Sequence, residues 1–189
     1  MPKYPYFESL EKLSASVVEA VRLSSEGSTK KGKEELFAIR HDSDKIVCEL
    51  ENALFSDFLP PLERDNIAAC AHSLSRVIDR SVELSLCNGN LTAASMLHEE
   101  AKICVALAEQ LHRDITLLRS IRKPSEMPAL EEFRALLAEG RNAHTAMLAK
   151  ISSGAFPRHV AECVNLCGKL RAELSRCFDE TVEIMLNNI

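Results

Sequence analysis

The chain has 189 residues, of which 46% are apolar, 27% charged and 5% aromatic, with 6 glycines and no tryptophan. This balance favours helices rich in Leu, Ala and Glu over sheets, which need more aromatic and β-branched residues, and the length suits one sizeable domain. The net charge of −5 argues against the basic surface that nucleic-acid binding requires, so we expect an all-α protein that does not bind nucleic acid.

Three long helices are predicted in the first half of the chain from apolar residues spaced three and four apart. The first covers about residues 6–25 and ends at a polar link. The second covers about residues 33–57 and is ended by Pro60 and Pro61. The third begins at Pro61 and ends before Asn and Gly residues at 88–90, which tolerate a left-handed C-cap.

Three more helices are predicted in the second half. The fourth starts at Asn90 or Thr92 and ends in cations at residues 119–123, which suit the dipole at a helix C-terminus. The fifth covers about residues 129–152, and the sixth follows Pro157. Six helices of this length with short links predict an antiparallel bundle.

The order of turns and helices is repeated along the chain. Setting Pro61 on Pro157 aligns Leu74 with Leu170, so each half has a proline corner followed by a long helix. This weak similarity predicts a single domain over residues 1–189 with an internal repeat of about 1–89 and 90–189, each of three helices.

The seven cysteines show no CxxC or zinc-ribbon spacing. Cys163 and Cys167 are four apart and could share a helix face as metal ligands, but both lie on the apolar stripe of the last helix. We favour core packing over metal or redox chemistry, because a free cysteine behaves as a small buried hydrophobe.

The N-terminus lacks the basic and then apolar form of a signal peptide. No window approaches the ~18 to 20 apolar residues of a membrane span. We therefore expect a cytoplasmic protein with reduced thiols.

The stretch FLPPLERDNI, residues 58–67, has the composition of a corner between two helices. Pro61 suits the first helical position, where its missing N–H has no partner to lose. Glu63 and Asp65 would lie in the first turn, where the helix dipole favours negative charge. Phe58 would pack across the corner on an apolar residue of the new helix as a hydrophobic staple.

The order of residues in this stretch resembles the F-I-T-P-I-[DE]-R-[DE]-D-I corner of the short PhoU-related proteins, a family of phosphate-transport regulators often linked to Pit-type phosphate permeases. Phe58, Pro61, Glu63, Arg64 and Asp65 stand at matching positions. The FESLEKL opening and a helix that resembles the family's HxxxDxIxxxL segment extend the resemblance over most of the chain. It implies a PhoU-like bundle of two spectrin-like three-helix units, without catalytic activity, that acts on membrane transport or phosphate sensing.

The corner also departs from the family pattern at one position. Pro60 stands where the family has a Thr able to cap the following helix. We expect this loss of a hydroxyl acceptor to cost about 1 kcal/mol.

The resemblance further implies E-x-x-x-D pairs on the long helices, whose carboxylates collect iron, zinc or similar cations. Asp44 and Asp79 retain one acid of each pair, but Arg40 and Arg76 stand where other acids are expected, and Glu139 is a weaker candidate in the second half. A guanidinium ~5 Å from a divalent ion would be repelled by about 7 kcal/mol at an effective dielectric constant of ~20.

We therefore hypothesise that Arg40 and Arg76 replace the charge of the metal by pairing with Asp44 and Asp79. Ordinary surface ion pairs explain the same residues equally well. We expect no cofactor; a transition metal, iron or zinc, would bind only if the degraded acidic motifs still held one.

The sequence thus favours a non-enzymatic PhoU-like regulator that contacts a membrane phosphate transporter or its regulatory kinase and is peripheral to the membrane at most. The long amphipathic helices are compatible with a homodimer. One alternative is a metal-carrying helical bundle, which needs several inward carboxylates and histidines at matched heights. Another is a generic helical adaptor whose apolar groove binds a partner helix.

For His144, on the apolar stripe of the fifth helix, a hydrogen-bonded core or boundary position is favoured over a ligand role beside Glu139.

Overall fold

The computed structural model describes residues 4–26, 29–87, 91–121, 123, 126, 130–156 and 158–187, and the side chains in these ranges except those of 91–95, 158 and 159. Over these ranges the chain forms six α-helices and no strand, as predicted. The helices are α1 (Tyr6–Ser25), α2 (Lys30–Ser56), α3 (Arg64–Cys87), α4 (Leu91–Leu117), α5 (Glu131–Ser152) and α6 (Arg158–Asn187).

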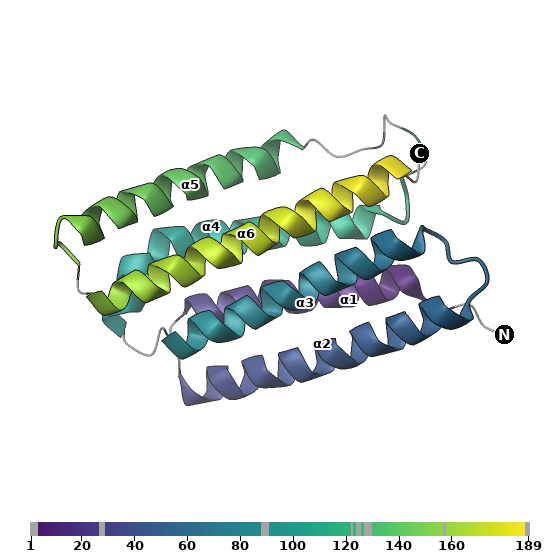
Figure 1. Ribbon diagram of the computed structural model, residues 1–189, viewed down its shortest axis with the longest axis horizontal. Coiled ribbons are helices and arrows are strands. Elements are labelled where there is room, and N and C mark those ends of the chain that lie inside the picture. The colour runs from purple at the N-terminus through teal and green to yellow at the C-terminus, as the bar shows by residue number, and fades with distance from the viewer. Residues whose placement is uncertain are drawn as a thin grey trace.

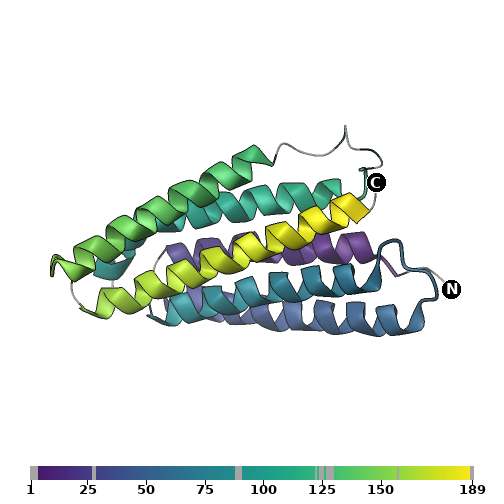
Figure 2. The same cartoon turned by 45° about the horizontal axis from the view of Figure 1, so that its top comes forward.

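The six helices form an elongated antiparallel bundle of two three-helix units (Figure 1). In the first unit α2 packs on α1 and α3, and in the second α5 packs on α4 and α6. The units meet where α3 lies along α6 and α1 lies along α4, so α2 and α5 lie on opposite outer sides (Figure 2). The predicted fold class is therefore confirmed. The numbering of the internal repeat remains a prediction.

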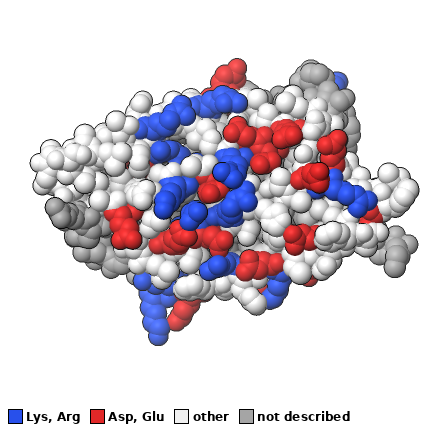
Figure 3. Space-filling view, in the orientation of Figure 1, with Lys and Arg blue, Asp and Glu red and all other residues white. Residues whose placement is uncertain are grey.

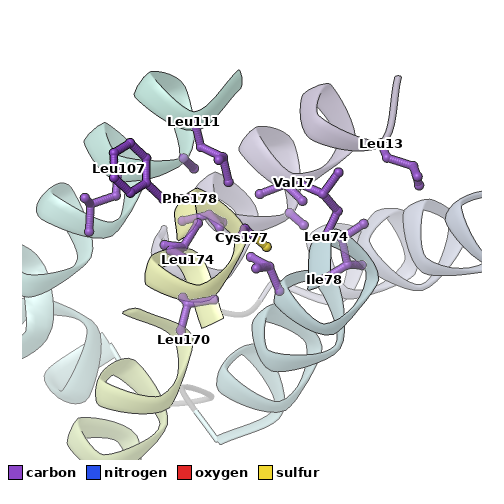
Figure 4. Close-up of a cluster of buried hydrophobic side chains, with 14 of the residues drawn as sticks. Leu13, Val17, Leu74, Ile78, Leu107, Leu111, Leu170, Leu174, Cys177 and Phe178 are labelled. Atoms are coloured by element: carbon purple, nitrogen blue, oxygen red, sulfur yellow. The ribbon is translucent and has the colours of Figure 1, made fainter. Parts of the chain in front are cut away.

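The core follows the junction between the two units. Apolar side chains from α1, α3, α4 and α6 point toward one another there (Figure 4). The helices bury these positions because their apolar residues recur every three or four residues and form one stripe per helix. The labelled members are all fully buried: Leu13, Val17, Leu74, Ile78, Leu107, Leu111, Leu170, Leu174, Cys177 and Phe178.

The cysteines mostly belong to this core. Five of them are buried, Cys48 is exposed and Cys87 is half-buried. Packing therefore explains the spacing of Cys163 and Cys167, as expected from the apolar stripe. The buried members are Cys70, Cys104, Cys163, Cys167 and Cys177.

Apart from the start of α3, two helix ends differ clearly from the prediction. The α2 helix begins earlier, at Lys30, because the Thr29 hydroxyl accepts a hydrogen bond from the Gly32 N–H at 3.0 Å and caps it. The α4 helix ends earlier, at Leu117, so Arg119 is not in its last turn. The Arg119 guanidinium instead binds Glu8 of α1 at 2.8 Å.

The predicted C-cap at residues 88–90 and the corner at Pro157 lie outside the described residues. None of the described helices combines the length and apolar character that a bilayer crossing requires.

Candidate functional site

The predicted corner between α2 and α3 is present, but its helix begins at Arg64 and not at Pro61. The Glu63 carbonyl accepts the first helical hydrogen bond, from the Ile67 N–H at 3.1 Å, so Glu63 is the N-cap residue. The expected cap position at Pro60, and the loss assigned to it, are therefore wrong. A residue that precedes proline is biased toward extended backbone, which delays the helix beyond the double proline.

Arg64 has a role that the motif alone does not reveal. Its guanidinium donates hydrogen bonds to the backbone carbonyls of Leu54 and Asp57, and to that of Phe58 at 3.1 Å. The last carbonyls of a helix have no partner within the helix and carry partial negative charge. Arg64 therefore caps the C-terminus of α2 from the first turn of α3. The Tyr6 hydroxyl adds a hydrogen bond to the Asp57 carboxylate at 2.9 Å.

The predicted hydrophobic staple by Phe58 is wrong, because this ring is 90% exposed. Leu62 contacts the core in its place. Phe55 is 89% exposed and Leu59 is 71% exposed in the same corner. We call Phe55, Phe58 and Leu59 the corner patch.

Arg40 and Arg76 form ion pairs between helices. Arg40 of α2 binds Asp79 of α3 at 2.8 Å, and Arg76 of α3 binds Glu173 of α6 at 3.3 Å. The expected pairings of Arg40 with Asp44 and of Arg76 with Asp79 are therefore both wrong, since Arg40 engages Asp79 and Arg76 engages Glu173. Asp44 is exposed on α2, and it lies near enough to Asp79 to raise the pKa of that carboxyl group.

A hollow of about 350 Å³ lies beside these ion pairs and is lined by residues of α2 and α3. Arg40, Arg76 and Arg80 line it together with Asp79 and Glu83. Figure 3 shows basic and acidic side chains interleaved across the face that carries α3 and α6. Each guanidinium has a carboxylate partner, with Arg80 bound to Glu83 at 2.8 Å, so the hollow carries little surplus charge.

Burial raises the pKa of Asp79, and this effect outweighs the opposite influence of Arg40. Asp44 and Glu83 raise the pKa further by repulsion between like charges.

Glu139 is exposed on α5 and is not brought to the other predicted acids. The α5 helix packs on α4 and α6, whereas Asp44 and Asp79 belong to α2 and α3 on the far side of the bundle (Figure 1). Within the described ranges, no three His, Cys, Asp or Glu side chains converge in a way that could hold a metal ion.

A buried ion cluster, formed by Glu100, His144 and Arg171, joins the three helices of the second unit. Glu100 of α4 is 2% exposed. Its Oε1 atom is hydrogen-bonded to His144 Nδ1 of α5 at 2.8 Å and accepts a hydrogen bond from Arg171 Nη1 of α6 at 3.1 Å. Arg171 Nη1 also donates to the Gly140 carbonyl at 2.9 Å. The cluster therefore fixes the relative positions of α4, α5 and α6.

Two glycines make room for this cluster. A Cβ atom on Gly168 would lie 2.7 Å from His144 Cε1, and one on Gly140 would lie 2.8 Å from Arg171 Cδ. Both distances are shorter than a van der Waals contact, so the imidazole and the guanidinium pack directly on helix backbone. The close approach explains why glycine is accepted inside two helices despite its low helix propensity.

The environment of the cluster disfavours charge. Burial raises the pKa of Glu100, although His144 and Arg171 oppose this effect. Burial raises the pKa of the Cys104 thiol to about 12 and that of Cys167 well above its usual value, with Glu100 adding to both. Both thiols therefore remain protonated near neutral pH, which suits packing and not nucleophilic chemistry.

One E-x-x-H sequence, the pattern used by di-iron bundles, occurs at residues 109–112. Both of its side chains are bound by α1: Glu109 pairs with Arg22, and His112 Nδ1 is hydrogen-bonded to the Ser14 hydroxyl at 2.8 Å. The motif thus serves the contact between α1 and α4.

The sequence signals for the buried ion cluster were present but incomplete. His144 is half-buried and hydrogen-bonded, as favoured from its place on the stripe, and its partner is Glu100 of α4. Glu100 lies between Leu97 and Cys104 at helical spacing, so it shares their buried face. A glutamate on an apolar stripe, opposite glycines in two neighbouring helices, was the pattern that could have revealed the cluster.

Comparison with known proteins finds similar structures but no similar sequences. No family profile matches the sequence, and no curated protein matches it. The fold matches a PhoU-like protein from Shewanella oneidensis MR-1 with a TM-score of 0.68 and 14% identity, covering 100% of both chains. It matches a second protein from the same organism, described as a candidate PhoU-like phosphate regulatory protein, with a TM-score of 0.68, 13% identity and 100% coverage of both chains. The PhoU-like fold expected from the corner motif is confirmed.

Proposed function

We propose that the chain is a non-enzymatic PhoU-like regulator of phosphate transport or phosphate signalling that acts through protein contacts. The full-length likeness of its fold to a candidate phosphate regulatory protein is the observation that carries this proposal. The corner motif of residues 58–67 supports the same family independently of the fold.

The polar groups of the bundle support a structural role over catalysis. The best-connected cluster, Glu100 with His144 and Arg171, is buried among three helices and holds them together. The neighbouring Cys104 is fully buried and kept protonated by its raised pKa. A nucleophile needs the opposite environment, which lowers its pKa and exposes it to substrate.

The corner patch supplies a surface for a protein partner. Phe55 and Phe58 expose nearly whole aromatic rings, whose burial would gain hydrophobic free energy on docking. Aromatic side chains of this kind are enriched among the residues that dominate binding energy. We infer that the patch docks on the cytosolic surface of a membrane phosphate transporter.

Cross-linking in cells followed by affinity purification tests this proposal. We expect the wild-type chain to capture a phosphate permease, and a Phe55→Ser/Phe58→Ser variant to capture more than tenfold less of it. The Leu148→Ser variant is the matched control, since Leu148 is an exposed apolar residue of α5 and should leave capture unchanged. Capture of a regulatory kinase in place of a permease would show that the kinase is the partner and would contradict docking on the transporter. Equal capture by all three chains would refute the role of the corner patch, and phosphate uptake that is unchanged by deleting the chain would refute the function.

We also propose that Arg40 and Arg76 supply the positive charge that a cation supplies in metal-binding relatives. The 2.8 Å pair between Arg40 and Asp79 supports this substitution. Elemental analysis of protein purified without chelators should then find less than one transition-metal ion per chain. A stoichiometric metal that is lost in the Asp44→Ala variant would overturn the substitution.

A further inference from the structure

Two thiols from different three-helix units touch at one end of the bundle. Cys87 is the last residue of α3, and Cys163 lies near the start of α6. Their Sγ atoms are 2.9 Å apart, which is closer than the van der Waals contact of two sulfur atoms. We propose that Cys87 and Cys163 form a reversible disulfide, with a hydroperoxide as the oxidant, that links the two units covalently.

The two cysteines differ in a way that assigns their roles. Cys87 is half-buried and lines an open hollow of about 520 Å³, so a small oxidant can reach its sulfur. Cys163 is 1% exposed, and burial raises the pKa of its thiol to about 12, with Cys87 adding to the shift. Cys87 is therefore the thiol that meets the oxidant, and Cys163 is the thiol that resolves the product.

The lining of the hollow favours an uncharged oxidant. Glu83 and Glu162 border it beside Cys87, and the sulfur lies at the negative end of the α3 dipole. An anion such as glutathione disulfide is repelled by this charge, whereas hydrogen peroxide is not.

The chemistry balances in two steps. The Cys87 thiol gives up its proton, and its sulfur attacks one oxygen of the peroxide as the O–O bond breaks. The leaving hydroxide takes up that proton and departs as water, and Cys87 becomes a sulfenic acid. The Cys163 sulfur then attacks the Cys87 sulfur, the S–O bond breaks, and the hydroxyl leaves as a second water with the Cys163 proton. Two thiols thus give up two electrons, and one peroxide becomes two waters. A dithiol reductant reverses the link by exchange.

The disulfide would close a loop between positions 76 residues apart and join helices that already pack along each other. A link of this span restricts the unfolded chain strongly, because stabilisation rises with loop length. For a chain of this size we expect the midpoint of thermal unfolding to rise by about 10 °C.

Peptide mapping of the full chain tests the proposal. Reduced protein is treated with hydrogen peroxide, blocked with N-ethylmaleimide and digested with trypsin, which releases Cys87 in peptide 81–102 and Cys163 in peptide 159–169. We expect a linked pair of these peptides that is lighter by two hydrogens, with fragment ions that place the bond on Cys163 and not on Cys167. Dithiothreitol should remove the link and the rise in the midpoint together.

Cysteine variants give the controls. The Cys87→Ser variant, at a half-buried site, should fold, lose the link and show no rise in the midpoint, and Cys163→Ala should do the same where it folds. Cys48→Ser removes an exposed thiol of α2 and should behave as wild type. A bond to Cys167, a bond between chains through Cys48, or a sulfinic acid on Cys87 without any link would each overturn the proposal.

Discussion

Replacing Arg171 with methionine is expected to lower the free energy of unfolding by about 3 kcal/mol. Arg171 Nη1 binds both the Glu100 carboxylate and the Gly140 carbonyl, and the buried Glu100 Oε2 atom has no hydrogen-bond partner in the part of the chain that the structure describes. Removing the cation leaves a buried carboxylate whose remaining partner among the described side chains is His144. A buried charge without its partner is far costlier than the loss of an exposed ion pair.

Urea unfolding of the variant and of Arg176→Met measures this effect. Arg176 is an exposed arginine of the same helix, and its pair with Glu173 at 3.9 Å should contribute little. A double variant, Glu100→Gln/Arg171→Met, should recover part of the loss, because no buried charge remains. Equal losses for Arg171→Met and Arg176→Met would show that the buried ion cluster does not stabilise the second unit.

The pH dependence separates the charge of the cluster from its packing. Burial raises the folded pKa of Glu100 above its ordinary value of 4.5, and Arg171 opposes that rise. The contribution of Glu100 to stability is therefore fully present below the unfolded pKa and is lost as pH rises through the folded pKa. Without Arg171 the folded pKa rises further and more of that contribution is lost. The stability gap between wild type and Arg171→Met should thus be wider at pH 8 than at pH 5, whereas a purely steric defect would give the same gap at both.

Replacing Phe178 with alanine is expected to lower the free energy of unfolding by about 4 kcal/mol. Phe178 of α6 is 1% exposed, and its ring stacks on Phe133 of α5 with centroids 3.9 Å apart and planes 3° apart. The Arg134 guanidinium lies 5.7 Å from the same ring. The substitution removes the stack and opens a cavity where α5 packs on α6, so the second unit should lose α5 first.

The Phe55→Ala variant is the matched control for this experiment. It makes the same chemical change at a ring that is 89% exposed, so its free energy of unfolding should change by less than about 0.5 kcal/mol. Urea unfolding of both variants gives the comparison, and hydrogen exchange of α5 amides shows whether that helix opens first. A loss below about 1 kcal/mol for Phe178→Ala would mean that the surrounding side chains refill the space.

The helices could be predicted from the sequence because their signals are local. Apolar spacing over residues 6–25 gave α1 with its observed ends. The predicted start of α3 was wrong because Pro61 suits the first position of a helix. The sequence does not show that Arg64 instead binds backbone carbonyls at the end of the preceding helix. That contact depends on how the chain turns at the corner.

The candidate site was predictable only in part, for a related reason. The arginines at 40 and 76 could be recognised as departures from an acidic pattern, but their partners depend on the facing helices. Asp79 is engaged by Arg40 of α2, and Glu173 reaches Arg76 from α6. A charged side chain on one helix can reach several oppositely charged side chains on the neighbouring helices. Only the packing of the helices decides which of them becomes its partner.

By itself, therefore, the sequence determined an all-α chain, its six helices, the stripes that form the core and the proline corner at residues 58–67, since these follow from local spacing and composition. Only the tertiary structure decided that Glu100 meets His144 and Arg171, that Cys87 touches Cys163, and that the rings of Phe55 and Phe58 remain exposed. Such contacts join residues 44 to 76 positions apart, and their geometry is set by how helices pack across the bundle.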